Sequence, residues 1–327
     1  MKVAFLGGGS FGSAMSKSMA ESGYDVILWD RKLETVQEIN ERHTNHKFLT
    51  EIELPHTIRA TTDLETALAH SEFIVLAVPS SAIREMAGRI KPYLTGEEII
   101  VSIAKGVDPK SLRPLSEVIH EVLGKDPVIL SGPSHAEEVA LDLPTTLVAS
   151  SKNELAMVRV QESFSTATLR IYRNHDLMGV EIGGAVKNII ALAAGMSDGI
   201  GFGDNAKAAL MTRGMAEIIR IGEKMGAQTD TFYGLTGMGD LIVTCTSMHS
   251  RNRRCGILIG QGKSVEEATK EVGMVVEGIK ATMAFHELAR KYGVEMPITD
   301  AVHQILFEDV TPKEAVYNLM TRDLKRE

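Results

Sequence analysis

A glycine-rich block directly follows the first apolar run of the chain, and it constrains the fold more than any other feature. Residues 3–6 are apolar, residues 7–12 read Gly-Gly-Gly-Ser-Phe-Gly, and residues 10–22 have helical spacing with Ser10 as the expected N-cap. The block fits the G-x-G-x-x-G motif in its required strand–turn–helix context, through Gly7, Gly9 and Gly12. Such glycines allow a tight turn, a close approach of a pyrophosphate, and close packing of helix on strand. The block therefore predicts a dinucleotide site at a helix N-terminus, in preference to a glycine-rich turn without a ligand.

The end of the second expected strand, residues 25–29, bears on the choice of cofactor. Asp30 lies where a carboxylate binds the ribose hydroxyls of NAD. Arg31 follows it, and a guanidinium at this point binds the 2′-phosphate of NADP. A solvated helix start is the alternative explanation for Arg31 and Lys32. The sequence therefore predicts NADP, NAD or both as the cofactor.

Apolar runs alternate with helical spacing in the first half of the chain, and only helical spacing follows. Continuous apolar runs between helices are typical of a parallel sheet covered on both faces. The expected strands are residues 3–6, 25–29, 73–78, 99–103 and 128–130, with 145–149 and 169–172 extending the sheet. The expected later helices are residues 176–197, 206–225, 265–270, 280–292 and 297–307, with Asp204-Asn205 capping the second. We predict a Rossmann-type doubly wound α/β domain over residues 1–174 and an all-helical domain over residues 175–327.

Composition narrows the class of protein. The net charge of −8 argues against nucleic acid as a partner, because Lys and Arg make most phosphate contacts. The sequence shows no obvious run of about 18 apolar residues, so we expect no membrane span. Cys245, Cys255 and His249 lack a fourth ligand at zinc-finger spacing, so we expect buried thiols and no metal. These features together predict a soluble protein of the reducing cytoplasm.

A lysine lies within an otherwise apolar helical stretch of the second half. Residues 183–194 are apolar almost all round, as in a buried helix, and Lys187 is the exception. A desolvated lysine is suited to proton transfer, whereas a lysine that reaches solvent at the domain edge is the alternative. Asp240 is expected as an N-cap, and also as a charge partner for Lys187 or as a hydrogen-bond acceptor for substrate hydroxyls, since these roles are compatible. The glycine-rich residues 234–239 before it are expected to form a substrate-side loop.

Two basic segments are candidates for anion binding. The run Ser250-Arg251-Asn252-Arg253-Arg254 places three arginines in an acidic chain. Arginine binds phosphate through two parallel hydrogen bonds, which favours an anion site over a solvated basic turn. Lys105 follows the strand 99–103 at its carboxyl end, the edge where open α/β sheets bind ligands. An exposed loop lysine is the alternative for Lys105.

Ordered blocks along the chain carry a family resemblance. They are Gly-Gly-Gly-Ser-Phe-Gly at 7–12, Ser-Ile-Ala-Lys-Gly at 102–106, Ser-Gly-Pro-Ser-His-Ala at 131–136, Val-Lys-Asn at 186–188, Gly-Met-Gly-Asp-Leu at 237–241, Ser-Arg-Asn-Arg at 250–253 and Val-Glu-Gly at 276–278. With these blocks the chain resembles the bacterial NAD(P)-dependent glycerol-3-phosphate dehydrogenase family from residue 7 to about residue 280. Phe11 stands where that family usually has Trp, Gly8 where it often has Ala, and His135 where Phe is common. Asp30 is also less typical, which leaves the cofactor preference open.

The resemblance implies a role for each matching position. Lys187 is implied to be the catalytic acid/base, with Lys105 and Asp240 beside the reacting carbons. The implied substrate contacts are Lys105, Gly132, Ser134, Lys187, Asp240, Ser250, Arg251 and Asn252. Together with the glycine motif, the expected cofactor contacts are Gly7, Gly9, Ser10, Phe11, Gly12, Asp30, Arg31, Lys105, Ala136, Arg251, Val275 and Glu277. His135 matches no catalytic position of the family, so we expect a cofactor-facing or structural role, and the resemblance also implies a homodimer.

We therefore expect reversible, NAD(P)H-dependent reduction of dihydroxyacetone phosphate to sn-glycerol 3-phosphate, which in this family supplies phospholipid synthesis. Hydride would pass from C4 of the nicotinamide to C2 of the substrate while Lys187 protonates the oxygen. A 3-hydroxyacid or ketopantoate-type dehydrogenase is the enzymatic alternative, and the Ser-Arg-Asn-Arg block argues against it by favouring a phosphorylated substrate. A non-catalytic NAD(P)-sensing protein is the other alternative. In a sensing protein the charged residues Lys105, Lys187 and Asp240 would have no catalytic role.

Overall fold

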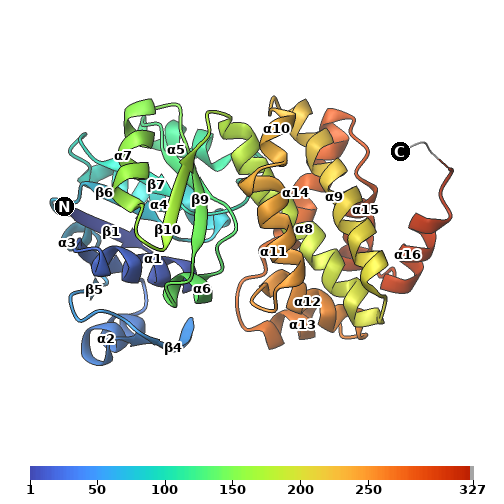
Figure 1. The fold of residues 1–327 in the computed structure, drawn as a ribbon, viewed down its shortest axis with the longest axis horizontal. Helices are drawn as coiled ribbons and strands as arrows, with labels where there is room; N and C mark the ends of the chain where they lie inside the picture. The colour runs from blue at the N-terminus through green and yellow to red at the C-terminus, as the bar shows by residue number, and fades with distance from the viewer. Residues whose placement is uncertain (325–327) are drawn as a thin grey trace. The chain divides into compact units, whose positions relative to one another are not determined.

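An eight-stranded sheet forms the centre of the first part of the structure, a computed structural model that describes residues 1–324 (Figure 1). The strand order is β10-β9-β8-β7-β6-β1-β2-β5. The strands are β1 (Lys2–Leu6), β2 (Asp25–Trp29), β5 (Arg59–Thr61), β6 (Phe73–Leu76), β7 (Ile99–Ser102), β8 (Val128–Ser131), β9 (Thr145–Ser150) and β10 (Leu169–Arg173). The expected strands are all present with small shifts at their ends, which confirms the predicted Rossmann-type α/β class.

The glycine-rich block lies where the strand order reverses. β1 pairs in parallel with β2 on one side and with β6 on the other. The chain therefore adds β2 and β5 on one side of β1 and then continues with β6 on the other side. The turns after β1 and β6 meet at the carboxyl edge of the sheet. They pack so closely that a Cβ on Gly7 would lie 2.6 Å from the carbonyl oxygen of Ala77. Open α/β sheets bind ligands at such a reversal point, so the fold places the block where a ligand is expected.

The alternation of strands and helices predicts a wholly parallel sheet, but one pair of strands in the structure is antiparallel. β8 and β9 are antiparallel, and β10 is parallel to β9. A parallel connection needs a crossover long enough to return the chain to the opposite edge of the sheet. The helix between these strands, α6 (Ala136–Ala140), has only five residues and is too short for that crossover.

Helices cover both faces of the sheet. One apolar cluster joins the strands to α1 (Ser10–Glu21), α2 (Leu33–Arg42), α6 and α7 (Glu154–Phe164). The other joins them to α3 (Leu64–Leu68), α4 (Ile83–Ile90) and α5 (Leu115–Leu123). Successive strand residues alternate between the two clusters, so both faces are apolar and the strand sequences read as continuous apolar runs. A small hairpin of β3 (Thr44–Asn45) and β4 (Leu49–Glu53), absent from the sequence-based expectation, lies outside the sheet.

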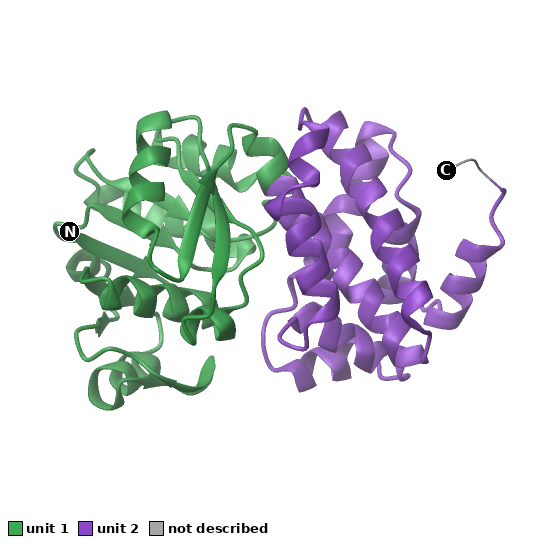
Figure 2. Ribbon diagram, viewed as in Figure 1, with its two compact units in different colours: residues 1–180 green, residues 181–327 purple. Residues whose placement is uncertain are grey.

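The second compact unit begins within helix α8. The two units are residues 1–180 and 181–327 (Figure 2), whereas the sequence places the boundary at 174, just before α8. The helices from this point are α8 (Leu177–Ile200), α9 (Asp204–Lys224), α10 (Thr229–Phe232), α11 (Asp240–Thr246), α12 (Arg251–Gly260), α13 (Val265–Val272), α14 (Glu277–Tyr292), α15 (Pro297–Phe307) and α16 (Pro312–Met320). The five expected helices are among them. Gly203, rather than the Asp204-Asn205 pair, occupies the N-cap position of α9.

Helix α8 is apolar along nearly its whole length. Its length and composition alone would allow it to cross a membrane, although no apolar run of that length was expected from the sequence. In the structure 83% of its most apolar window is buried, as in the core helix of a globular unit. α12 crosses it at very close range, because a Cβ on Gly195 of α8 would lie 2.1 Å from the carbonyl oxygen of Arg253, and one on Gly256 would lie 2.1 Å from that of Leu192. Small residues at the crossing therefore bring the start of α12 against α8.

Glu217 on α9 is a buried carboxyl that binds the start of α15. Its oxygens accept the N–H groups of Ile298 and Thr299 and the hydroxyl of Thr299. Burial raises the pKa of Glu217 from 4.5 to about 7, so the folded protein holds a proton that the unfolded chain releases at lower pH. The stabilisation from this proton is complete below the pKa of the unfolded chain and is lost as the pH rises through about 7.

We therefore expect the stability of the wild type, relative to Glu217→Gln, to fall between about pH 5 and about pH 8 by on the order of 2–4 kcal/mol. Glutamine has nearly the same shape as glutamate but does not ionise. The pH dependence of the stability of Glu217→Gln therefore comes from all the other groups of the protein. Urea unfolding of both proteins at the two pH values measures the difference. A difference that stays constant with pH would show that Glu217 does not exchange a proton in this range.

Candidate active site

The N-terminus of α1 is open at the glycine-rich turn. Gly9, and not Ser10 as expected, occupies the N-cap position, and no side chain caps the helix. The first turn also contains no acidic side chain. The N–H groups of a first helical turn have no partners within the helix, and together they attract an anion. A Cβ on Gly9 would meet nothing within 4 Å, so the backbone is accessible here, as a pyrophosphate requires. The structure therefore fits the dinucleotide that the motif predicts.

The third glycine of the motif has a packing role. A Cβ on Gly12 would lie 2.3 Å from the carbonyl oxygen of Gly7, so no larger residue fits where α1 crosses the turn. Phe11 beside it is partly buried against the apolar cluster of this face. Ala136, at the start of α6, belongs to the same cluster. These two expected cofactor contacts thus also pack in the core beside the turn.

Lys105, Gly132 and Ser134 come together at the carboxyl edge of β7 and β8. The ammonium of Lys105 donates to the carbonyl oxygen of Gly132 at 2.9 Å, and the hydroxyl of Ser134 donates to the same oxygen at 3.0 Å. The buried hydroxyl of Ser131, at the end of β8, has no hydrogen-bond partner in the structure. His135 occupies the N-cap position of α6 without a side-chain cap bond. The sequence blocks at 102–106 and 131–136 are therefore one cluster in space.

Lys187 lies in a buried polar cluster of the second unit. Its ammonium is 2.6 Å from Oδ1 of Asp240 and 2.6 Å from the hydroxyl of Thr244. The side chains of Lys187 and Asp240 are only 6% and 2% exposed, so the lysine does not reach solvent. Asp240 is the first residue of α11, and Gly239 precedes it at the N-cap position. Of the alternatives in the sequence, the charge partner of Lys187 matches this geometry, and the N-cap does not.

Thr244 is a site residue that the sequence analysis missed. It lies one helical turn after Asp240, and its hydroxyl donates to the carbonyl oxygen of Asp240 while it accepts from Lys187. Residues four apart on a helix share a face, but this relation is only visible once α11 is recognised as a helix. The glycine-rich residues before it are also helical, because Leu235–Gly239 form a π-helical turn instead of the expected loop. Such turns are frequent at functional sites.

Both cysteines lie near these elements and are buried, as expected. Burial raises the pKa of the Cys245 thiol on α11 to about 12. Burial also raises the pKa of the Cys255 thiol on α12. A thiol in such surroundings stays protonated and unreactive, so these residues are core side chains.

The basic run begins a helix rather than a turn. Ser250 is the N-cap of α12, and its hydroxyl accepts the N–H of Arg253. The arginines of the run differ in role. The guanidinium of Arg253 is tied to Asp198 of α8 at 2.7 Å and to the carbonyl oxygen of Thr246, so it is structural. Arg251 is partly buried and stands in the first turn, where the helix N-terminus adds its own attraction for an anion.

Asn252 joins three helices beside this turn. Its amide donates to Oδ1 of Asn188, the neighbour of Lys187, at 2.8 Å, and its oxygen accepts the N–H of Gly278 in the first turn of α14 at 2.9 Å. The blocks at 186–188, 250–253 and 276–278 therefore converge in the second unit. Val275 is 40% exposed just before α14, and Glu277 is the first residue of that helix.

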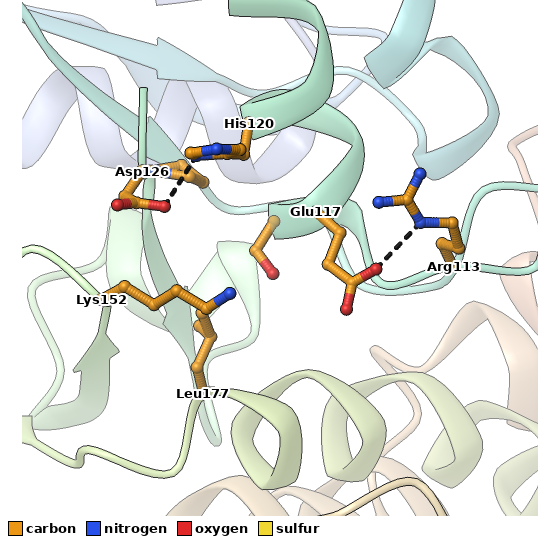
Figure 3. A pocket seen from close by; sticks show the side chains of 8 residues that line it. Arg113, Glu117, His120, Asp126, Lys152 and Leu177 are labelled. Atoms are coloured by element: carbon orange, nitrogen blue, oxygen red, sulfur yellow. Dashed lines mark hydrogen bonds and ion pairs between the residues drawn. The ribbon is translucent and has the colours of Figure 1, made fainter. Parts of the chain in front are cut away.

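A separate cavity of about 150 Å³ lies along α5, away from the residues proposed above (Figure 3). Its lining consists of Arg113, Ser116, Glu117, His120, Asp126, Pro127, Lys152 and Leu177. Arg113 is paired with Glu117, and His120 with Asp126, within the lining itself. Several polar side chains of this cavity thus bind one another, and none of the expected substrate or cofactor contacts lines it.

Comparison with known proteins places these sites in a family. A family model described as the NAD-dependent glycerol-3-phosphate dehydrogenase N-terminus matches residues 2–157, and the model of the C-terminus of the same family matches residues 176–317. The chain belongs to the NAD-dependent glycerol-3-phosphate dehydrogenase family. The predicted family resemblance is therefore confirmed.

Individual members of the glycerol-3-phosphate dehydrogenase family are similar over the whole chain. An NAD(P)+ glycerol-3-phosphate dehydrogenase of Clostridium tetani is 58% identical over 326 residues, which cover 99% of this chain and 93% of the relative. The crystal structure of the enzyme from Coxiella burnetii is 40% identical with a TM-score of 0.95, and the match covers 98% of this chain and 99% of the other. A ketopantoate reductase of Ralstonia eutropha is 16% identical with a TM-score of 0.64, over 97% of this chain and all of the other, and shares the fold alone.

Proposed function

We propose that the chain reduces dihydroxyacetone phosphate to sn-glycerol 3-phosphate with NAD(P)H, reversibly. The buried cluster of Lys187, Asp240 and Thr244 carries the proposal, since it provides a positioned ammonium in a chain of this dehydrogenase family. A protein that only senses a dinucleotide has no need of such a group. The NAD(P) cofactor agrees with the open helix N-terminus at the glycine turn.

The residues of the cluster fit the chemistry of carbonyl reduction. When bound, NAD(P)H supplies the hydride that is added to C2 of the substrate. Lys187 donates a proton to the carbonyl oxygen as the negative charge develops there, and takes it back in the reverse direction. The ammonium donates to Asp240 and to Thr244, and these two bonds fix its position in the buried cluster.

The first turn of α12 is the proposed phosphate site. A phosphate dianion is bound well by a guanidinium together with the N–H groups of a helix N-terminus. Arg251 and Asn252 are the first two residues of this helix, and Ser250 caps it. Asn252 uses its side-chain amide within the protein, so we propose that it contributes through its backbone. Lys105, Gly132 and Ser134 in the first unit are the further proposed contacts of the substrate.

The family resemblance also supports a physiological setting. We propose that the enzyme acts in the cytoplasm as a homodimer and supplies glycerol phosphate for phospholipid synthesis. The first unit is proposed to bind the dinucleotide, and the second to bind the substrate and carry Lys187. Ser10, Phe11, Ala136, Val275 and Glu277 are the remaining proposed cofactor contacts.

A single assay tests the proposed reaction. Oxidation of NADH and of NADPH is followed with dihydroxyacetone phosphate, ketopantoate and short 3-oxoacids as substrates. We expect turnover with dihydroxyacetone phosphate and little with the others. Turnover with ketopantoate or a 3-oxoacid in its place would support the alternative dehydrogenase, and no turnover with any of them would support a sensing protein.

The side chain of Arg31 provides a test of the cofactor site. Arg31 is exposed and directly follows Asp30 at the end of β2. A guanidinium at this position pairs with a 2′-phosphate, which NADPH has and NADH lacks. We expect Arg31→Ala to weaken the binding of NADPH more than that of NADH, as measured by the dissociation constants of both. Equal weakening would show that Arg31 contacts the adenine or nothing at all.

A further inference from the structure

Both backbone polar groups of Gly8, in the middle of the glycine turn, are hydrogen-bonded to side chains of other segments. Its N–H donates to Oδ2 of Asp30 at 2.9 Å, and its carbonyl oxygen accepts from the amide of Asn45 at 2.8 Å. Asn45 is 1% exposed and also binds the hydroxyl of Ser13 in α1. The turn is therefore tied to the end of β2 by a carboxylate and to the β3–β4 hairpin by an amide.

The carboxylate of Asp30 is fixed by two segments of backbone. Oδ2 accepts the N–H of Gly8, and Oδ1 accepts the N–H of Lys32 at 2.9 Å. A carboxylate has about four lone-pair positions, so each oxygen keeps one for a hydroxyl group. Because donors hold both oxygens, rotation of the side chain would break at least one of these bonds. The negative charge therefore stays at the end of β2.

Gly8 makes room for this arrangement. A Cβ at position 8 would lie 3.0 Å from Oδ2 of Asp30, 3.2 Å from the side chain of Leu28 and 3.3 Å from that of Thr35. Leu28 and Thr35 are both buried and have little freedom to move. An alanine would therefore push the carboxylate away from the Gly8 N–H by a few tenths of an ångström. Gly8 and Asp30 are therefore one structural unit.

We propose that the Gly8–Asp30 pair selects NAD(H) over NADP(H). In Rossmann-type folds the adenosine ribose lies against the end of the second strand, where a carboxylate binds its hydroxyls. Asp30 presents its remaining lone pairs to those hydroxyls, and its charge repels the 2′-phosphate of NADP(H) at short range. Arg31 is exposed and attracts that phosphate, but the carboxylate is locked in place and does not move aside for it. The proposal depends on the dinucleotide part of the proposed function and not on the identity of the carbonyl substrate.

Fluorescence titration of NADH and NADPH against the wild type, Asp30→Asn, Gly8→Ala and the double variant tests the proposal. We expect the wild type to bind NADH at least about tenfold more tightly than NADPH, and Asp30→Asn to reduce this ratio by about tenfold or more. Gly8→Ala keeps the charge but displaces it, so the ratio should fall by a smaller factor. The double variant should behave like Asp30→Asn, because displacement has no effect once the charge is gone.

Asp25→Asn is the matched control, because Asp25 is an exposed aspartate at the other end of β2 that pairs with Arg59. Its ratio should equal that of the wild type. Gly8→Ala also carries the test alone if Asp30→Asn fails to fold. A wild type that binds both cofactors equally, or an Asp30→Asn that weakens both by the same factor, would overturn the proposal. Reduction of dihydroxyacetone phosphate is measured separately, so loss of the proposed reaction and loss of cofactor selection are distinct results.

Discussion

Lys187→Ala is expected to lower turnover by about 10²–10⁴-fold while NADH binding stays nearly unchanged, because a positioned general acid contributes rate enhancement of this size. The lysine lies 2.6 Å from both Asp240 and Thr244, and its side chain is 6% exposed, so alanine removes a buried and positioned ammonium. Steady-state turnover with dihydroxyacetone phosphate and the dissociation constant of NADH measure the two quantities. A variant that keeps more than about a third of wild-type turnover would refute the assignment.

Two further variants separate catalysis from folding. Lys187→Ala leaves the Asp240 carboxylate buried without its charge partner, which destabilises a protein by about 3–5 kcal/mol. Lys187→Gln retains a hydrogen-bond donor toward Asp240 but has no acidic proton, so turnover should fall as far while more of the stability remains. Lys263→Ala is the control, because Lys263 is a partly exposed lysine of the same unit that pairs with Glu271. Its turnover should match that of the wild type.

The sequence was sufficient to predict features that follow from local pattern. The glycine block, the strands of the sheet and helix α8 each depend on a run of neighbouring residues, and hydrophobic spacing or turn chemistry reveals such runs. The position of the dinucleotide turn at the carboxyl edge follows from the order of strand and helix. Lys187 was identified because a charged residue in an apolar helix is energetically costly without a partner.

Features that depend on contacts between distant segments were not predictable in this way. Thr244 belongs to the short helix α11, which has too few turns to show a clear period, and its relation to Lys187 exists only in the folded chain. Asn45 lies in a two-residue strand without any periodicity, yet it binds the glycine turn 37 residues away. The side chain of Asn252 fits a substrate contact in the sequence, whereas its amide is bound by Asn188 and Gly278. Local sequence does not contain these partners.

The same distinction applies to the basic run. Residue type alone does not distinguish Arg251 from Arg253, but helix α12 directs them differently. The guanidinium of Arg253 forms an ion pair with Asp198 on α8, at 2.7 Å, and so links α12 to α8. Arg251 stands in the first turn, beside the capping residue Ser250. Mutation of the two arginines should therefore have different consequences, which makes the pair a sharp test of the phosphate site.

Arg251→Ala is expected to raise KM for dihydroxyacetone phosphate by about 10–100-fold, since hydrogen bonds to a charged group contribute about 1.5–3 kcal/mol. Unphosphorylated dihydroxyacetone, already a poor substrate, lacks the group that Arg251 binds, so its kcat/KM should change far less. Arg253→Ala should instead lower the unfolding midpoint, because it removes one basic partner of Asp198 and leaves Lys207, and it should affect the two substrates alike. Steady-state kinetics with both substrates and thermal unfolding of both variants make the comparison. If Arg251→Ala reduces kcat/KM equally for both substrates, Arg251 does not recognise the phosphate, and the N-terminus of α12 loses its proposed role.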